Sequence, residues 1–205
     1  TVPEAEWVQD LQHLKDLGGN FIRGAHYQQA DRFLELCDEM GVLVWEESLG
    51  WGNGQEYTKS IGDFTDPEFR EQQIKQTRDM VRNSFNHPSV IIFSFLNEPG
   101  STTKECKSLI DELIATVKAE NSGRLVTFAC NMGVNDICNE NTDLIAINNY
   151  PGVIPCYPGE PATLRKKVNE SFDEIVASFR TRYPDKPIMI SETGYGAVYG
   201  WHDQA

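Results

Sequence analysis

The sequence is poor in the features that mark membrane proteins, metal proteins and nucleotide-dependent enzymes. Its 205 residues contain no visible signal peptide and no apolar run of about 18 residues, the length that indicates a membrane span. Its five cysteines form neither a CxxC pair nor a zinc-ligand pattern. No phosphate-binding loop or dinucleotide fingerprint occurs either. The sequence therefore gives no reason to expect a membrane partner, a bound metal or a nucleotide cofactor.

Positive charge is also scarce. The chain has 18 Lys and Arg residues against 31 Asp and Glu residues, a formal net charge of −13. This disfavours nucleic acid as a partner, because phosphate contacts require clusters of Lys and Arg. Cys37 and Cys106 fall on the apolar faces of expected helices, which indicates core thiols and slightly favours a reducing, cytoplasmic compartment. Because the sequence starts at Thr1, secretion after removal of a signal peptide stays open.

Helical and strand-like segments alternate along the whole chain. Strands are expected at residues 20–23, 42–45, 90–96, 125–129, 144–148 and 188–191. The segments between them carry apolar residues at helical spacing. Such alternation is typical of a parallel sheet with crossover helices. It predicts an α/β fold, a partial (β/α)8 TIM barrel with about six of the eight strands present, as a single domain over residues 1–205.

Local signals bound the expected elements. Gly41 predicts the C-terminal stop of a helix, and Asp66 before a proline predicts the N-cap of another. Thr102 and Glu105 have the spacing of a capping box, which predicts a helix start at Thr102. The strand at residues 42–45 is expected to end in two consecutive glutamates.

Two carboxylates, Glu98 and Glu192, each directly follow an expected apolar strand. Because the C-terminal ends of parallel barrel strands meet at one mouth, both side chains are expected to face the same cavity. Hydrolysis of a glycosidic bond needs such a pair: one carboxyl group protonates the leaving oxygen, and the other attacks the sugar or activates water. The alternative is that each is a surface residue at a strand end, which fits one such glutamate better than two.

Four blocks of sequence resemble glycoside hydrolase family two, which includes β-glucuronidases and β-galactosidases. In chain order they are NFIRGAHY at residues 20–27, NHPSV with NEP at residues 86–90 and 97–99, NNY at residues 148–150, and ISETG at residues 190–194. NEP alone occurs across a larger clan of glycosidases. The order and spacing of all four blocks extend the similarity over nearly the whole chain. The resemblance implies a retaining β-glycosidase that needs no organic cofactor.

The resemblance also implies roles for the two carboxylates and their partners. Glu98 would be the general acid and then the general base, and Glu192 would be the nucleophile that forms a covalent glycosyl-enzyme. Arg23 and the Tyr150 hydroxyl would donate hydrogen bonds that keep the nucleophile charged. The residues alone leave open that Arg23 is a structural ion-pair partner and that Tyr150 only packs.

Further residues of the four blocks would contact the sugar. By the resemblance, Asn97 would bond the sugar 2-hydroxyl, and His26 would line the sugar site or contact Glu98. Asn97 could instead cap the following loop, and His26 could be a core histidine. Glu46 and Glu47 stand where the family often has Asp-Glu, and a structural role is at least as plausible for them as a role in the site.

The chain departs from the family pattern in two ways. Gly24-Ala25 and Glu192-Thr193 stand where the family commonly has Thr-Ser and Glu-Tyr, which leaves the sugar open and the reaction type intact. By the resemblance, the first and eighth strands and the preceding β-sandwich domains are absent. We therefore expect a fragment of a longer multidomain glycosidase. Its exposed barrel edges could pair in a homo-oligomer.

Three functions are compatible with these observations. The first is hydrolysis of terminal β-glycosidic bonds of a carbohydrate substrate, with β-glucuronidase slightly favoured over β-galactosidase by the resemblance of the block at residues 148–150 and of the segment from Ser191 to His202. The second is an endo-β-glucanase or mannanase of the same clan, which would cleave a polymer in mid-chain. The third is a catalytically silent barrel fragment that binds carbohydrate without turning it over.

Overall fold

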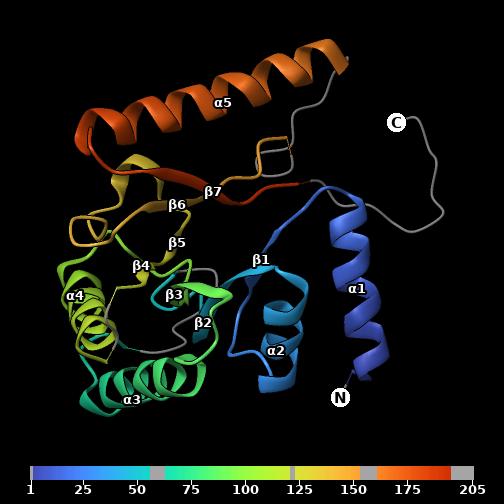
Figure 1. The fold of residues 1–205 in the computed structure, drawn as a ribbon. Coiled ribbons are helices and arrows are strands. Elements are labelled where there is room, and N and C mark those ends of the chain that lie inside the picture. Colours follow the sequence, from blue (N-terminus) through green and yellow to red (C-terminus); the bar gives the residue numbers. More distant parts are fainter. Residues whose placement is uncertain (1, 56–62, 121–122, 153–160, 195–205) are drawn as a thin grey trace.

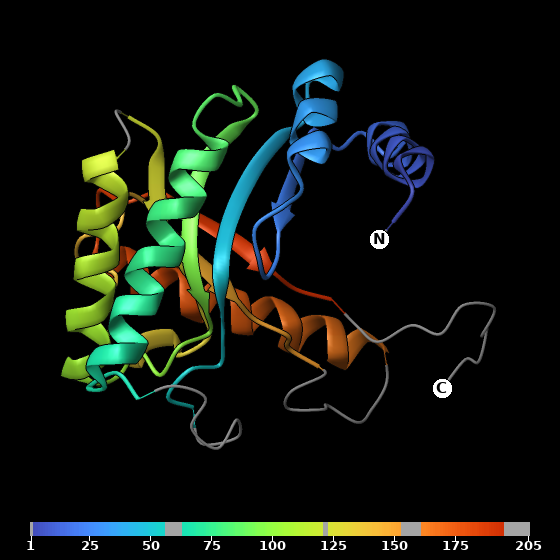
Figure 2. The same cartoon turned by 90° about the horizontal axis from the view of Figure 1, so that it is seen from below.

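Parallel strands occupy the centre of the molecule, and helices surround them (Figure 1 and Figure 2). The structure, a computed structural model, describes residues 2–55, 63–120, 123–152 and 161–194. The strands are β1 (Phe21–Gly24), β2 (Leu43–Trp51), β3 (Val90–Asn97), β4 (Leu125–Thr127), β5 (Ala129–Cys130), β6 (Ile145–Asn148) and β7 (Ile188–Glu192). The helices are α1 (Glu4–Asp16), α2 (Asp31–Met40), α3 (Pro67–Ser84), α4 (Lys104–Glu120), α5 (Pro161–Arg182) and the short 3₁₀ helix η2 (Gly133–Asn135).

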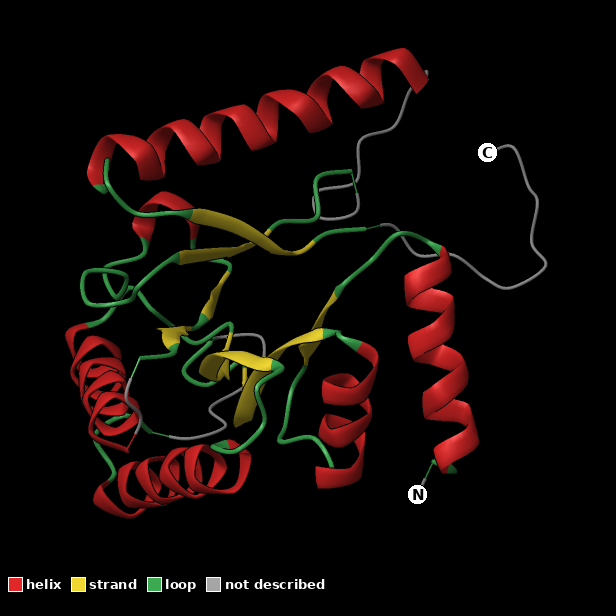
Figure 3. Cartoon of the chain, viewed as in Figure 1, coloured by secondary structure: helices red, strands yellow, loops and turns green. Residues whose placement is uncertain are grey.

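The order of the strands in space follows their order in the chain. β1 to β4 form one parallel sheet, and β5 to β7 form a second. Only Phe128 separates β4 from β5, and the backbone N–H of Glu98, just after β3, donates to the Ala129 carbonyl over 2.9 Å. The strand expected at residues 125–129 is therefore present as two short pieces. The prediction of a partial (β/α)8 barrel is confirmed, and Figure 3 shows its alternation of helix and strand.

β2 is longer than the sequence predicted. It continues through Glu46 and Glu47 to Trp51, although acidic residues are depleted in strands. Successive strand residues point to opposite faces. Glu47 therefore shares a face with Trp45, whose indole N–H donates to it over 3.2 Å, whereas Glu46 accepts from Ser84 of α3 over 3.4 Å. Both glutamates are buried within the strand rather than marking its end.

Two of the three predicted helix boundaries are confirmed. Gly41 ends α2 in the left-handed conformation with φ 69°, and the Asp66 side chain caps α3 by accepting a backbone N–H over 2.9 Å. The predicted cap at Thr102 is wrong by one residue. Thr103 Oγ1 accepts the N–H of Cys106 over 3.2 Å, just before α4. Two adjacent threonines made the sequence ambiguous, because either could stand at the N-cap.

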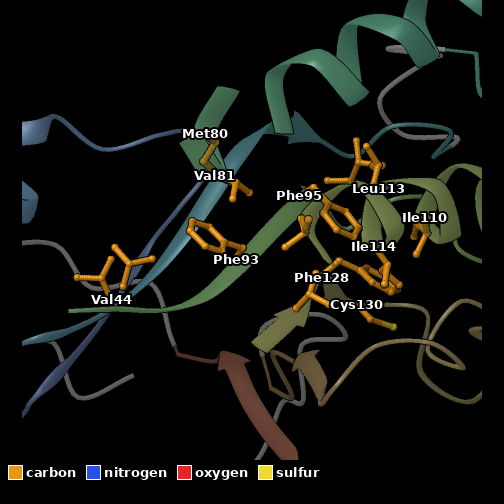
Figure 4. Close-up of a cluster of buried hydrophobic side chains, with 14 of the residues drawn as sticks. Val44, Met80, Val81, Phe93, Phe95, Ile110, Leu113, Ile114, Phe128 and Cys130 are labelled. Carbon is orange, nitrogen blue, oxygen red and sulfur yellow. The ribbon is translucent and has the colours of Figure 1, made fainter. Parts of the chain in front are cut away.

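The core has two layers. The larger layer lies between the strands and the helices α2 to α4, and Figure 4 shows Phe93 and Phe95 of β3 with Met80 of α3 and Leu113 of α4. Fully burying each such side chain contributes about 1.5–3 kcal/mol. A smaller layer consists mainly of strand residues and fills the barrel interior: Trp45, Ile92, Ala129, Leu144 and Ala146. The barrel is therefore packed, and its strand ends are left to carry a site.

The remaining expectations about the fold concern its cysteines, its helices and its edges. Cys37 and Cys106 are buried in the larger core layer, as expected. In the described part of the chain, no helix combines the length and apolar character needed to cross a membrane. β1 and β7 lie at the two ends of the strand order, and Ile190 in β7 is 38% exposed. Pairing through these edges stays a prediction.

Candidate active site

The six side chains singled out by the sequence belong to one hydrogen-bonded network at the C-terminal ends of the strands. They come from β1 and the residues after it, from the end of β3, from just after β6 and from β7: Arg23, His26, Asn97, Glu98, Tyr150 and Glu192. The most distant partners, Arg23 and Glu192, are 169 residues apart in the chain. The barrel topology alone brings them together.

Glu192 is held between a guanidinium group and a phenol. Arg23 Nη1 donates to Glu192 Oε1, and the Tyr150 hydroxyl donates to Glu192 Oε2 over 2.7 Å. Burial by itself would raise the pKa of Glu192, but the hydrogen bonds from Tyr150 and Arg23 outweigh it and lower the pKa. Burial and the nearby Glu192 charge raise the pKa of Tyr150 to about 12, so the phenol keeps its proton and donates. Glu192 is therefore an ionised carboxylate.

Arg23 is fixed in its orientation by several partners. Its Nη2 donates to Glu47 Oε2 over 2.8 Å and to Asn97 Oδ1 over 2.7 Å, and its Nε donates to the same Glu47 oxygen over 3.2 Å. The guanidinium carbon lies 5.1 Å from the centre of the Trp45 ring, within range of a cation–π contact. These contacts aim the remaining nitrogen, Nη1, at Glu192.

Glu98 is held by amides. Asn148 Nδ2 donates to Glu98 Oε1 over 2.8 Å, and Asn131 Nδ2 donates to Glu98 Oε2 over 3.1 Å. The backbone of Glu98 has φ 48°, a left-handed conformation that is uncommon for residues other than glycine. Its N–H bond to the Ala129 carbonyl holds that conformation. Such backbone strain concentrates at functional sites, where surrounding bonds maintain it.

Asn97 joins the two carboxylate environments. Its Oδ1 accepts from Arg23 on one side and from Asn148 Nδ2, over 3.1 Å, on the other. Ser191 fixes the Asn148 amide by donating to its Oδ1 over 2.7 Å. Among the described residues, the buried Asn97 Nδ2 has no hydrogen-bond partner. A buried donor without a partner costs about 1–3 kcal/mol, so a hydroxyl group of a ligand would relieve it.

His26 contacts Glu47. Its Nδ1 lies 3.2 Å from Glu47 Oε1, and the side chain is 37% exposed, so this ring is not a core histidine. The role expected for His26, at the sugar site or against Glu98, stays a prediction beside this bond to Glu47. The hydrogen bond to Glu47 is the largest influence on the His26 pKa and raises it. His26 therefore carries positive charge over a wider pH range than a free histidine.

Three residues of this network were missing from the predicted site. Asn131 directly follows β5, Asn148 ends β6 within the NNY block, and Glu47 belongs to the acidic pair whose role was left open. The rule that selected Glu98, a polar residue at the C-terminal end of a strand, also applies to Asn131 and Asn148. In the described ranges, no group of three or more His, Cys, Asp or Glu side chains could hold a metal ion.

A protein-family model matches nearly the whole chain. The family described as "Glycosyl hydrolases family 2, TIM barrel domain" matches residues 1–204. The chain belongs to this family. Over 196 residues it is 30% identical to the β-glucuronidase of Canis lupus familiaris, which covers 95% of this chain and 28% of that protein. The chain thus spans well under half the length of this family 2 relative.

Solved structures give the same result for the fold. The GH2 β-galacturonidase from Eisenbergiella tayi, solved with galacturonate bound, superimposes with a TM-score of 0.84 and 32% identity, covering 99% of this chain and 34% of that one. The β-glucuronidase from Ruminococcus gnavus, solved with uronic isofagomine, superimposes with a TM-score of 0.88 and 25% identity, covering 98% and 35%. The resemblance stated from the four sequence blocks is confirmed.

Proposed function

We propose that this family 2 barrel carries the catalytic centre of a retaining β-glycosidase of the β-glucuronidase type, acting on terminal β-glycosidic bonds. The observation that carries the proposal is the unequal setting of two carboxylates at one barrel mouth. Glu192 is held ionised by Arg23 and Tyr150, whereas Glu98 lies between the amides of Asn131 and Asn148. A nucleophile and a proton donor need environments that differ in this way.

In the first step, Glu192 attacks the anomeric carbon of the sugar. A bond forms between a Glu192 carboxylate oxygen and that carbon while the bond from the carbon to the leaving oxygen breaks. Glu98 gives its proton to the leaving oxygen, so the aglycone departs as a neutral alcohol. Arg23 and Tyr150 keep the nucleophile unprotonated before the attack and orient its two oxygens.

In the second step, water cleaves the glycosyl-enzyme. Glu98, now a carboxylate, takes one proton from water as the water oxygen bonds the anomeric carbon. The bond to Glu192 breaks, and the carboxylate is restored. Two inversions at the same carbon give net retention, and both catalytic groups end in their starting protonation states.

Asn97 is proposed to bind the sugar 2-hydroxyl. Its Nδ2 is buried without a partner in the described residues, while its Oδ1 is fixed by Arg23 and Asn148. The amide hydrogen is therefore oriented in advance toward a ligand. Hydrogen bonds to the 2-hydroxyl strengthen as charge develops at the neighbouring carbon, so this contact would favour the transition state over the substrate.

A uronic acid is the sugar that the relatives favour. The similar proteins are β-glucuronidases and a β-galacturonidase, whose sugars both carry a carboxylate. We therefore rank a β-glucuronide first and a β-galactoside second.

Labelling with 2-deoxy-2-fluoro-β-glucuronyl and β-galactosyl fluorides tests the proposal. The fluorine slows breakdown of the glycosyl-enzyme, so the adduct can be located by peptide mapping. We expect one glucuronyl adduct per chain on Glu192, and none in the Glu192→Gln variant. No adduct in a folded sample, or an adduct on another residue, would refute the assignment. Sugar binding without an adduct would instead support the silent carbohydrate-binding alternative.

A further inference from the structure

We propose that Glu47 is a positioning residue for this reaction, dividing its two carboxylate oxygens between Arg23 and His26 and so orienting both cationic groups beside the nucleophile. The proposal rests on the function proposed above for Glu192. It assigns work in the site to one member of the acidic pair, and a purely structural role to the other.

The contacts of Glu47 are complete and divided by oxygen. Oε2 accepts from Arg23 Nη2 at 2.8 Å, from Arg23 Nε at 3.2 Å and from Trp45 Nε1 at 3.2 Å, while Oε1 faces His26 Nδ1 at 3.2 Å. The side chain is fully buried. A buried carboxylate is tolerated when hydrogen bonds and an opposite charge compensate its lost hydration, and here both are present.

Glu47 also sets how much positive charge reaches the nucleophile. Arg23 forms ion pairs with both Glu47 and Glu192, so its charge is shared between two carboxylates. If Glu47 were neutral, that charge would act on Glu192 alone and stabilise its ionised form further. A carboxylate stabilised in this way gives up less energy when it bonds to carbon, so it attacks more slowly. Arg23 would also lose two of the hydrogen bonds that aim it.

Glu46 provides a matched control on the same strand. It is likewise fully buried but points to the opposite face, where it accepts from the Gln29 backbone N–H over 2.9 Å and from Ser84 over 3.4 Å. Glu46→Gln therefore removes the same chemical group from the same strand without changing any bond to Arg23 or His26. A difference between the two variants reports the position of the carboxylate and not its burial.

The kinetic experiment compares Glu47→Gln with Glu46→Gln on the full chain, using an aryl β-glucuronide across a range of pH. Bonds to charged groups contribute about 1.5–3 kcal/mol each, so we expect Glu47→Gln to lower kcat by roughly 10- to 100-fold with little change in KM. Glu46→Gln is expected to keep kcat within about threefold of wild type. Equal losses in the two variants would overturn the proposal.

A second measurement does not depend on turnover. Because Glu47 raises the pKa of His26, the His26 ring resonances followed by NMR against pH are expected to titrate at lower pH in Glu47→Gln and at the wild-type pH in Glu46→Gln. Loss of one ring signal in His26→Gln assigns the resonance. An unchanged His26 midpoint in folded Glu47→Gln would refute the role of Glu47 in orienting and charging this histidine.

The two arms separate the possible failures. If wild type neither turns over nor becomes labelled, the proposed function fails, and the His26 titration still decides whether Glu47 holds its cationic partners. If Glu47→Gln does not fold, Glu47→Asp replaces it, because a carboxylate shortened by one carbon keeps the charge but cannot reach both partners. We then expect a smaller loss of kcat and a smaller shift of the His26 midpoint than for full removal, and wild-type values for both would overturn the proposal.

Discussion

The two ends of the candidate site treat their carboxylates differently. At the β7 end, Glu192 accepts hydrogen bonds from a permanently charged guanidinium group and a phenol. At the β3 end, Glu98 accepts them from two neutral amides. A cation in contact favours the charged form of a carboxylate, and the pKa of Glu192 is lowered accordingly. One barrel mouth thus holds two carboxylates with unlike partners, in keeping with the two different roles proposed for them.

Backbone geometry follows the same division. Glu192 is the last residue of β7 and pairs with Asn148 of β6, directly after a register shift in that ladder. Glu98 lies just past β3 in a left-handed conformation, with φ 48°. Glu192, the proposed nucleophile, is thus a paired strand residue beside an irregularity in the ladder, whereas Glu98, the proposed acid/base, lies on the turn that leaves the sheet.

The largest expected effect separates the two carboxylates by their dependence on the leaving group. Glu98→Gln is expected to lower kcat by about 10²–10⁴-fold for glucuronides of poor leaving groups, because general acid catalysis contributes on that scale. It should have little effect on the first step for fluoride or nitrophenyl leaving groups, which need no proton. Glu192→Gln should abolish turnover of both classes. Steady-state and burst kinetics on one substrate of each class measure these effects. If Glu98→Gln lost kcat equally with poor and with good leaving groups, Glu98 would not be the general acid.

A smaller effect is expected from Tyr150→Phe, at the β7 end of the site. The variant loses the 2.7 Å hydrogen bond that orients the Glu192 carboxylate, and we expect the misplaced carboxylate to lower kcat/KM by roughly 10- to 100-fold. Because that bond lowers the pKa of Glu192, its loss raises the pKa, and the variant must reach higher pH before the nucleophile is ionised. The acidic limb of the pH profile should therefore move to higher pH. An acidic limb unchanged in position would show that Tyr150 does not help to keep Glu192 ionised.

At the β3 end of the site we expect a smaller loss of kcat and no shift of the acidic limb of the pH profile. Asn131→Ala removes one neutral donor from Glu98 and is expected to reduce kcat by about tenfold or less. Asn148→Ala should reduce kcat further than Asn131→Ala does, because Asn148 also donates to Asn97. Neither variant should move the acidic limb that Glu192 sets. A shift of that limb in Asn131→Ala as large as in Tyr150→Phe would show that the two ends are not separate.

Glu46→Gln is expected to have the smallest effect on activity of these variants but a large effect on stability. Burial raises the pKa of Glu46 to about 7 from 4.5, and the folded state therefore favours its neutral form. Stability from this group is full below pH 4.5 and is lost as pH rises to about 7, a difference of about 3 kcal/mol. Glu46→Gln should therefore be more stable than wild type at pH 8 and similar at pH 4. Urea unfolding at the two pH values measures this, and lower stability at pH 8 would contradict it.

Glu47→Gln, on the opposite face of β2, is expected to change the unfolding free energy in the other direction. There the substitution leaves the buried Arg23 charge with one fewer anionic partner, which is strongly destabilising for buried ion pairs. At pH 8 we expect the unfolding free energy to fall in Glu47→Gln and to rise in Glu46→Gln. Two adjacent and equally buried glutamates would then respond with opposite signs.

Much of the fold could be predicted because its signals are local. Alternating helical and apolar strand segments gave all six strand positions, and Gly41 and Asp66 marked helix ends where the structure has them. The two errors, in the start of α4 and the end of β2, arose where a neighbouring residue gave the same or a contrary local signal. Thr102 and Thr103 offer the same cap one residue apart, and the charges of Glu46 and Glu47 hid the continuation of β2.

The candidate site was predicted less completely than the fold. Glu98 and Glu192 stood out because each follows an apolar strand, and the family resemblance supplied Arg23, Tyr150 and Asn97. Asn131 was missed because a single asparagine after a short strand resembles any loop residue. Its role depends on a bond to Glu98, 33 residues earlier in the chain.

The strands, their order and the two carboxylates at their ends could be predicted from the sequence, because these depend on local periodicity and on the direction of parallel strands. The family resemblance implied Arg23 and Tyr150 as partners of Glu192, but the partners of Glu98 and of the two adjacent glutamates appeared only in the tertiary structure. Arg23 joins Glu192 across 169 residues, and the alternation of β2 sends Glu47 to the site and Glu46 to α3. A displacement of one residue along a strand exchanges the two faces, and only the folded barrel shows which face meets Arg23.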